Sequence, residues 1–263
     1  MLIFIPYCTL LGIPLFTTIS GAKEARFHGV EIHLVSFRSY GAALLCRNRA
    51  GLLGLATHFH QGWSLRENPT HWYNHVLNAL GYLPRNGYAL ADHIPPTGGP
   101  VVVYADRLSE TRGRPNYWLQ TCSQFGRDGR YALPYVRFLE AVRRHRLPVV
   151  FDTQHYLEYA LNVRGVEDLP QDRRELFDLL AEGWRELGSF VKEIQLCDSD
   201  PRLGHTGGRN VFIGEGILPL RDFCRLVKES GWDGVVVPEV KPSHLLRPRR
   251  IGELRARVIE LFS

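Results

Sequence analysis

Short apolar runs alternate with longer amphipathic stretches along the chain. This alternation predicts parallel β-strands that are connected by helices. Eight runs rich in Val, Ile, Leu and Phe are predicted as strands: Leu2–Pro6, Val30–Val35, Leu53–Phe59, Val101–Ala105, Tyr117–Thr121, Pro148–Asp152, Glu193–Cys197 and Gly234–Val240. Helices are predicted where apolar residues recur at spacings of three and four, as in Tyr135–His145, Arg173–Leu187, Leu218–Ser230 and Ile251–Phe262.

The middle of the chain has the weakest pattern. Residues Gly81–Pro100 are polar and rich in Gly and Pro, with only a short helical pattern around Tyr88–His93. A second strand count therefore makes Tyr88–His93 a strand and assigns Tyr117–Thr121 to a loop. Both counts keep the alternation of strand and helix.

Eight strand–helix units in 263 residues favour a closed barrel over an open doubly wound sheet. A GxGxxG dinucleotide motif is also missing after the first strand. We therefore predict a single (β/α)8 TIM barrel, with residues 1–263 as one domain. In such a barrel the functional groups lie on the loops that follow the strands.

Composition indicates the cellular compartment and the kind of partner that the protein binds. Five cysteines without a CxxC pair indicate a reducing compartment, and the apolar start Met1–Phe16 is interrupted by Pro6 and Pro14. We expect a cytoplasmic protein without a membrane segment.

A net charge of +5 suits the binding of phosphorylated or carboxylated small molecules. The basic stretch Lys241–Arg257 has no interleaved aromatic residues, so we expect a small-molecule substrate and no nucleic acid, with a homo-oligomer left open.

Asp152 and His155 leave the end of the predicted sixth strand three residues apart. A carboxylate that closes an apolar strand needs a cation or several hydrogen-bond donors as partners. The pair is thus a candidate catalytic or metal-binding group. The alternative is that Asp152 caps the following helix while His155 packs in its first turn.

Two further strand ends carry polar groups. Gln195 points where an apolar side chain is expected on the seventh strand, so it either ligates something or is a satisfied core glutamine. Glu239 closes the eighth strand as Asp152 closes the sixth, and Lys241 follows it. A simple salt bridge between Glu239 and Lys241 is the alternative to a catalytic role for both.

Three residues are candidates for binding substrate. Arg209 lies in the glycine-rich segment Gly207–Gly216 and can hold a carboxylate, a phosphate or hydroxyl groups, while the glycines let the backbone approach a ligand. Tyr104 can stack on a sugar ring. His58 is the third candidate, and because it shares the third strand with His60, we expect only one of the two to face the barrel interior.

The polar motifs occur in a characteristic order: Asp-Thr-Gln-His at 152–155, Ile-Gln-Leu-Cys-Asp at 194–198, Ile-Gly-Glu-Gly at 213–216 and Pro-Glu at 238–239. In this order they resemble the xylose-isomerase-like barrel superfamily. That group includes sugar isomerases and epimerases, dehydratases of cyclic polyols and keto acids, and type-IV apurinic endonucleases. The resemblance is strongest from Pro148 to Pro242, and Gly-Val-Glu-Ile at 29–32 is similar to a segment common there.

The resemblance implies one divalent metal ion (Mn, Mg, Co or Zn). In the superfamily this ion is held by a Glu after the fifth strand, the Asp of the sixth, a His or Gln of the seventh and the Glu of the eighth. Asp152, Gln195 and Glu239 match three of these places. Gln120 stands where the superfamily has Glu, although under the second strand count Asp106 would take this place.

A glutamine at position 120 would leave two carboxylates, which disfavours a two-base epimerase. It leaves room for a one-base elimination in which His155 or Glu239 takes the proton and the metal or Lys241 polarises the carbonyl. We therefore predict a metal-dependent isomerase or lyase that acts on a small sugar, polyol or keto acid. The main alternative is a catalytically impaired barrel that binds a sugar-like ligand.

A divergent apurinic endonuclease is the third hypothesis. Five positions stand where that branch has His, Glu, His, Asp and His, and here they are Tyr104, Gln120, Gln195, Gly208 and Asn210. These differences argue against a trinuclear zinc site.

Overall fold

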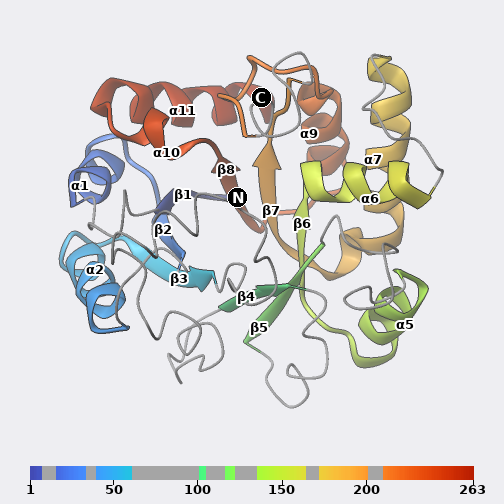
Figure 1. The fold of residues 1–263 in the computed structure, drawn as a ribbon, viewed down its shortest axis with the longest axis horizontal. Coiled ribbons are helices and arrows are strands. Elements are labelled where there is room, and N and C mark those ends of the chain that lie inside the picture. Colours follow the sequence, from blue (N-terminus) through green and yellow to red (C-terminus); the bar gives the residue numbers. More distant parts are fainter. Residues whose placement is uncertain are drawn as a thin grey trace, which may run out of the picture.

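The computed structural model describes residues 1–7, 16–33, 40–60, 101–104, 116–121, 135–163, 172–200 and 210–263. Eight parallel strands form a closed barrel in the order β1 to β8 (Figure 1). Their bounds are β1 Leu2–Tyr7, β2 Gly29–His33, β3 Ala56–His60, β4 Val101–Tyr104, β5 Tyr117–Gln120, β6 Val149–Asp152, β7 Val191–Cys197 and β8 Val235–Glu239. The barrel closes where β1 pairs with β8, at Leu2 with Val235 and Ile3 with Val236. The predicted (β/α)8 barrel is confirmed.

The second strand count is wrong, because Tyr117–Gln120 is a strand that pairs with both β4 and β6. The segment Tyr88–His93 lies outside the described residues. Strand β3 begins three residues later than predicted. The reason is that Gly54, with a φ of 71°, lies in the turn that ends the preceding helix.

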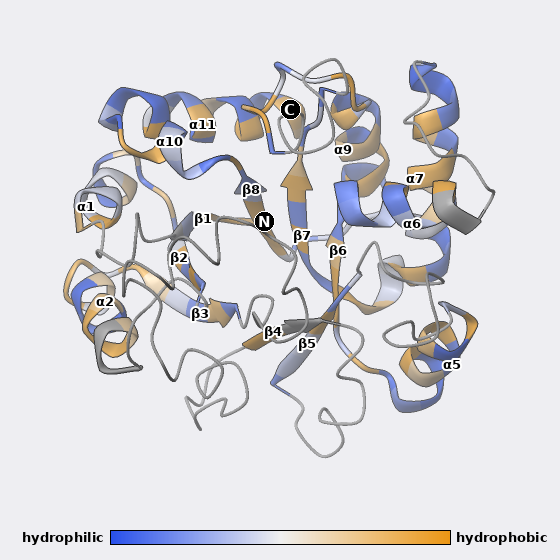
Figure 2. Ribbon diagram, in the orientation of Figure 1, coloured by the Kyte–Doolittle hydropathy of each residue, from blue (hydrophilic) through white to orange (hydrophobic). Residues whose placement is uncertain are grey.

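Helices cover the outside of the barrel (Figure 1). Their bounds are α1 Phe16–Glu24, α2 Tyr40–Leu52, α5 Tyr135–His145, α6 Thr153–Val163, α7 Arg173–Leu187, η3 Gly188–Phe190, α9 Leu220–Glu229, α10 Pro242–Leu245 and α11 Pro248–Leu261. Figure 2 shows polar and apolar residues on different sides of α9 and α11. In the described ranges, no helix combines the length and the apolar character that crossing a membrane requires.

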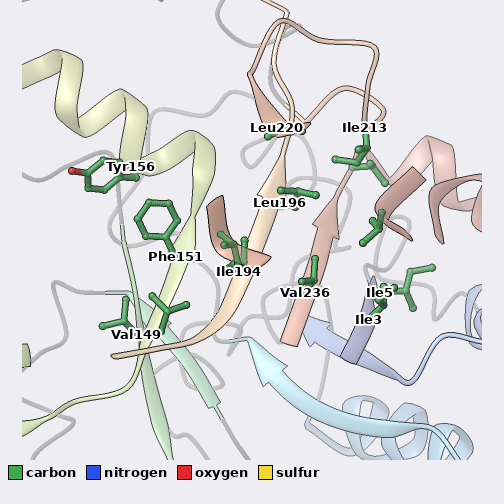
Figure 3. Packing of buried hydrophobic residues seen from close by; sticks show 14 of the residues in the cluster. Ile3, Ile5, Val149, Phe151, Tyr156, Ile194, Leu196, Ile213, Leu220 and Val236 are labelled. Atoms are coloured by element: carbon green, nitrogen blue, oxygen red, sulfur yellow. The ribbon is translucent and has the colours of Figure 1, made fainter. Parts of the chain in front are cut away.

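The main apolar core lies between the strands and the helices. On β7, Ile194 and Leu196 are buried in this core, where Figure 3 shows them near Phe151. The Phe151 ring also stacks on Phe223 of α9, with centroids 5.5 Å apart. Each such buried side chain stabilises the fold by roughly 1.5–3 kcal/mol. Because side chains alternate along a strand, the residues between these apolar ones point into the barrel.

Candidate functional site

Polar side chains fill the barrel interior toward the carboxyl ends of the strands. They are Glu31 and His33 of β2, His58 and His60 of β3, Gln120 of β5, Asp152 of β6, Glu193, Gln195 and Cys197 of β7, and Glu239 of β8. His58 and His60 both face the interior, where each bonds to a side chain of another strand. The expectation that only one of them does so is wrong, because residues two apart on a strand share a face.

The deepest layer of this polar interior joins two glutamates through one histidine. His58 Nε2 lies 2.9 Å from Glu31 Oε2 and 3.1 Å from Glu193 Oε2. Burial, together with the charge of Glu31, raises the pKa of Glu193 well above its ordinary value. Burial acts in the same direction on Glu31, but the imidazoles of His60, His33 and His58 lower its pKa well below the ordinary value. Glu31 is therefore the charged member of the pair, and Glu193 is neutral.

Two glutamines form the next layer and bridge the strands. Gln120 Nε2 donates to Asp152 Oδ2 at 3.2 Å and to Gln195 Oε1, and Gln120 Oε1 lies 2.9 Å from His60 Nε2. Gln195 Nε2 donates to both oxygens of Glu31 at 3.4 Å. Each amide oxygen thus already has a hydrogen-bond partner. A metal ion held by these two glutamines would have to replace those hydrogen bonds.

The upper layer brings Asp152, Cys197 and Glu239 together. Cys197 Sγ lies 3.6 Å from each carboxylate oxygen of Asp152 and 3.7 Å from Glu239 Oε2. Burial and the charge of Asp152 raise the pKa of Glu239 to about 7. Asn210 Nδ2 donates to Glu239 Oε2 at 3.4 Å, from a left-handed backbone conformation with a φ of 51° that Asn tolerates.

The two carboxylate oxygens of Asp152 have different partners. Its Oδ1 accepts a hydrogen bond from the backbone N–H of His155 at 2.8 Å and so caps α6, while Oδ2 faces Gln120 inside the barrel. The His155 ring lies 3.9 Å from Asp152 Oδ2 and 3.4 Å from Glu158 Oε2. Burial lowers the pKa of His155, but Asp152, Glu158 and Glu239 outweigh it and raise this pKa to about 9.

This raised pKa predicts a pH-dependent contribution of His155 to stability. The folded-state pKa of about 9 exceeds the ordinary 6.5, so the contribution is full below pH 6.5 and is lost as the pH rises through 9. Its upper limit is about 3 kcal/mol. We expect the stability difference between chelator-treated wild type and His155→Gln to shrink between pH 6.5 and 9 in urea unfolding. A difference that stays constant over this range would contradict the prediction.

Asp198 organises the loop after β7. Its carboxylate accepts hydrogen bonds from the backbone N–H groups of Gly214 at 2.9 Å, Gly216 at 3.0 Å and Leu218 at 3.2 Å. A Cβ atom at Gly216 would lie 2.1 Å from Asp198 Oδ1, so only glycine fits there. The sequence predicted that glycines of this segment let the backbone approach a ligand. Gly214 and Gly216 instead bring the backbone close to the carboxylate of Asp198.

The structure describes the remaining predicted site residues only in part. Lys241 follows β8, is partly exposed, and donates its backbone N–H to the carbonyl of Asn210 at 3.0 Å. The structure describes the backbone of Tyr104, which ends β4, but not its side chain. Arg209 and Asp106 lie outside the described residues.

Four further residues lie in the polar interior without a role predicted from the sequence: Glu31, His33, Glu193 and Cys197. The signal for them was a polar residue at every second position of a strand. It is present in Glu-Ile-His on β2 and in Glu-Ile-Gln-Leu-Cys on β7.

Three groups in the described part of the chain have metal-ligand atoms within 4.8 Å of one another. They are Glu31–His33–His60–Glu239, Glu31–His58–Glu193 and Asp152–Cys197–Glu239. The second group is completely buried, whereas the side chains of His33 and Glu239 are each 14% exposed. The first and third groups therefore each include a partly exposed side chain, and the second group includes none.

This parallel barrel carries carboxylates and histidines at the carboxyl ends of its strands, which is where the active sites of (β/α)8 enzymes lie. The model of the family described as xylose isomerase-like TIM barrel matches residues 104–259, which is more than half of the chain. The chain belongs to this family. A comparison with curated proteins finds no match.

Solved structures share the fold along nearly the whole chain. A D-tagatose 3-epimerase-like protein is 16% identical, with 99% of this chain and 97% of that chain covered and a TM-score of 0.58. D-Psicose 3-epimerase of Clostridium cellulolyticum is 14% identical, with both chains covered completely (100%) and a TM-score of 0.55. Endonuclease IV of Thermus thermophilus is 14% identical, with 98% of each chain covered and a TM-score of 0.50. At these identities the likeness concerns the fold alone.

Proposed function

We propose that the protein is a metal-dependent isomerase or lyase that acts on a small sugar, polyol or keto acid. The observation that carries this proposal is the meeting of Asp152, His155 and Glu239 at the carboxyl ends of β6 and β8, linked through Cys197. Family membership and the fold shared with sugar epimerases support it. The isomerisation and the elimination proposed here begin with the same step, the removal of a proton from the carbon next to a carbonyl of the substrate.

In this proposal Glu239 is the base that removes the proton. Its partly exposed side chain reaches the mouth of the barrel, and the Asn210 amide orients its Oε2. His155, held protonated at neutral pH by the carboxylates around it, donates a hydrogen bond or a proton to the substrate oxygen. A divalent ion bound between Asp152 and Glu239 would stabilise the negative charge on that oxygen.

The remaining ligands and substrate contacts are proposed as follows. Gln195 and Gln120 complete the metal ligands by turning their amide oxygens away from their present hydrogen bonds. Lys241 and Arg209 bind anionic or hydroxyl groups of the substrate, and Tyr104 packs against its carbon skeleton. His58 is only 2% exposed and lies between two glutamates, so we assign it a positioning role.

Deuterium exchange tests the step common to both reactions. We expect the chain, supplied with Mn²⁺, Co²⁺, Mg²⁺ or Zn²⁺ in D2O, to incorporate deuterium next to the carbonyl of at least one ketose or keto acid. Proton NMR measures this incorporation, and D-tagatose and D-psicose are the first ketoses to examine. Metal-free protein is the control, and exchange at the same rate without metal would contradict the proposed role of the ion.

A barrel that binds a sugar-like ligand without catalysis is the second candidate. The observation in its favour is that Gln120 and Gln195, at two expected metal-ligand places, are engaged in hydrogen bonds with protein groups. Ligand binding in calorimetry without any deuterium exchange would support this candidate over the enzyme.

A further inference from the structure

We propose that Glu31, His33, His60 and Glu239 form a binding site for a divalent transition-metal ion, on the side of the barrel mouth made by β2, β3 and β8. This site is separate from the position between Asp152 and Glu239 and shares only Glu239 with it. Its existence does not depend on the reaction proposed above, because metal binding can be measured without substrate.

The spacing of the ligand atoms fits a small metal ion. All four side chains offer a ligand atom within 4.8 Å of the others. His33 Nε2 lies 2.9 Å from Glu31 Oε1 and 4.0 Å from Glu239 Oε1. Two ligand atoms bound tetrahedrally at about 2.0–2.2 Å from zinc are roughly 3.4 Å apart. The two observed distances lie on either side of this value, so small side-chain movements would admit the ion.

Neighbouring residues already hold the proposed ligands in place. His58 Nε2 binds Glu31 Oε2 at 2.9 Å, which leaves Oε1 directed toward His33. Gln120 Oε1 lies 2.9 Å from His60 Nε2 and fixes the orientation of that ring. Metal ligands in proteins are commonly oriented by such outer hydrogen bonds. His58 keeps this role with either ion bound, whereas Gln120 keeps it only while its amide oxygen is not a ligand of the ion between Asp152 and Glu239.

The two imidazoles are arranged as a pair. The rings of His33 and His60 stack with centroids 4.5 Å apart and an interplanar angle of 5°. A stack of two imidazolium ions would be unfavourable because like charges repel. A stack in which at most one ring is protonated avoids that repulsion, and a divalent ion bound to both rings would replace that proton. The stacked pair thus fits a shared positive ion better than two protonated histidines.

The ligand types indicate which ions fit. Two imidazoles and two carboxylates carry a net negative charge when the carboxylates are ionised, which a divalent cation neutralises. Imidazole favours zinc, iron and cobalt, whereas magnesium and calcium prefer sites made of oxygen alone. We therefore expect Zn²⁺ or Co²⁺ to bind here much more tightly than Mg²⁺.

Glu239 faces both ligand groups at once. Its Oε1 is the oxygen near His33, and its Oε2 is the oxygen near Cys197 and Asn210. A carboxylate in this arrangement can bridge two metal ions, which lie about 3.5–4 Å apart in known two-metal sites. Filling both positions would give two ions per chain, one of which needs His33 and His60.

The test uses the full chain without a histidine tag. Protein is stripped with a chelator, dialysed, and titrated with Zn²⁺ in a calorimeter, and bound zinc is counted by mass spectrometry. We expect His33→Ala and His60→Gln each to weaken zinc binding at one site by at least about 100-fold, or to remove one zinc per chain. His145→Ala, which changes an exposed histidine of α5, should bind zinc as wild type does. Asp152→Asn should retain the ion held by the histidines.

X-ray absorption of the zinc-loaded wild type keeps the test independent of how the variants fold. Scattering from imidazole rings around zinc is the expected result, and a shell of oxygen ligands alone would overturn the inference. Unchanged zinc binding in a folded His33→Ala would overturn it as well. If Asp152→Asn loses all zinc while His33→Ala loses none, the inference fails and the proposed function stands. If zinc binds as expected but no deuterium exchange occurs, the proposed function fails instead.

Discussion

Replacing Glu239 with glutamine should lower the rate of deuterium exchange by about a thousandfold. A positioned general base contributes roughly 10²–10⁴-fold to a proton transfer, and an amide cannot accept the proton. Glu239 is the carboxylate of the upper layer that is partly exposed at the barrel mouth, beside His33 and Cys197. The measurement is the initial rate of deuterium incorporation by NMR, at saturating metal and substrate.

The same variant separates loss of function from loss of structure. Glutamine keeps the volume of Glu239, and it removes a carboxylate whose pKa is raised by burial and by the charge of Asp152. We therefore expect the melting temperature to stay the same or to rise. Glu229→Gln, on the exposed surface of α9, is the matched control for the charge change. Exchange by Glu239→Gln within a few-fold of wild type would rule out Glu239 as the base.

Replacing Asp152 with alanine should destabilise the protein by about 3 kcal/mol. The change leaves the backbone N–H of His155 without its acceptor and removes one of the two acceptors of Gln120 Nε2, and each unsatisfied buried N–H costs about 1–3 kcal/mol. Burial raises the pKa of Asp152, so removing its charge offsets part of this cost. At roughly 2–4 °C per kcal/mol for a chain near this size, the melting temperature should fall by about 6–12 °C.

Asp152→Asn provides the comparison. Its side-chain oxygen can still cap α6, and Gln120 can turn its amide to present an oxygen to the new NH2 group. We expect a loss of about 1 kcal/mol or less in the free energy of unfolding. Equal destabilisation by both variants in chelator-treated protein would show that the negative charge, and not the cap, is what stabilises this position.

The fold could be predicted because its pattern is local and repeated. Each strand is a short apolar run such as Val149–Asp152, and helices α5 and α7 have the bounds that their apolar periodicity predicts. Asp152 and Glu239 could be found for a similar reason, since each closes an apolar strand. His58 and His60 both face the interior, contrary to the prediction, because residues two apart on a strand share a face.

The proposed histidine site could not be assembled in the same way. Glu31 and Glu239 lie near opposite ends of the chain, and β2 and β8 come near each other only because β1 pairs with both. The protonation states also depend on this packing. Three imidazoles around Glu31 outweigh the effect of burial and keep it charged, while its neighbour Glu193 becomes neutral.

By itself, the sequence determined seven of the eight strands, their alternation with the helices, and the presence of polar groups at the ends of β6, β7 and β8, while the pairing of β5 with β4 and β6 decided the remaining strand. These features follow from the alternation of side chains along single elements. Only the tertiary structure decided which of those groups meet. Closing the barrel places side chains of six strands in one interior of low dielectric, where their hydrogen bonds and charges determine which carboxylates are ionised and where a metal ion would bind.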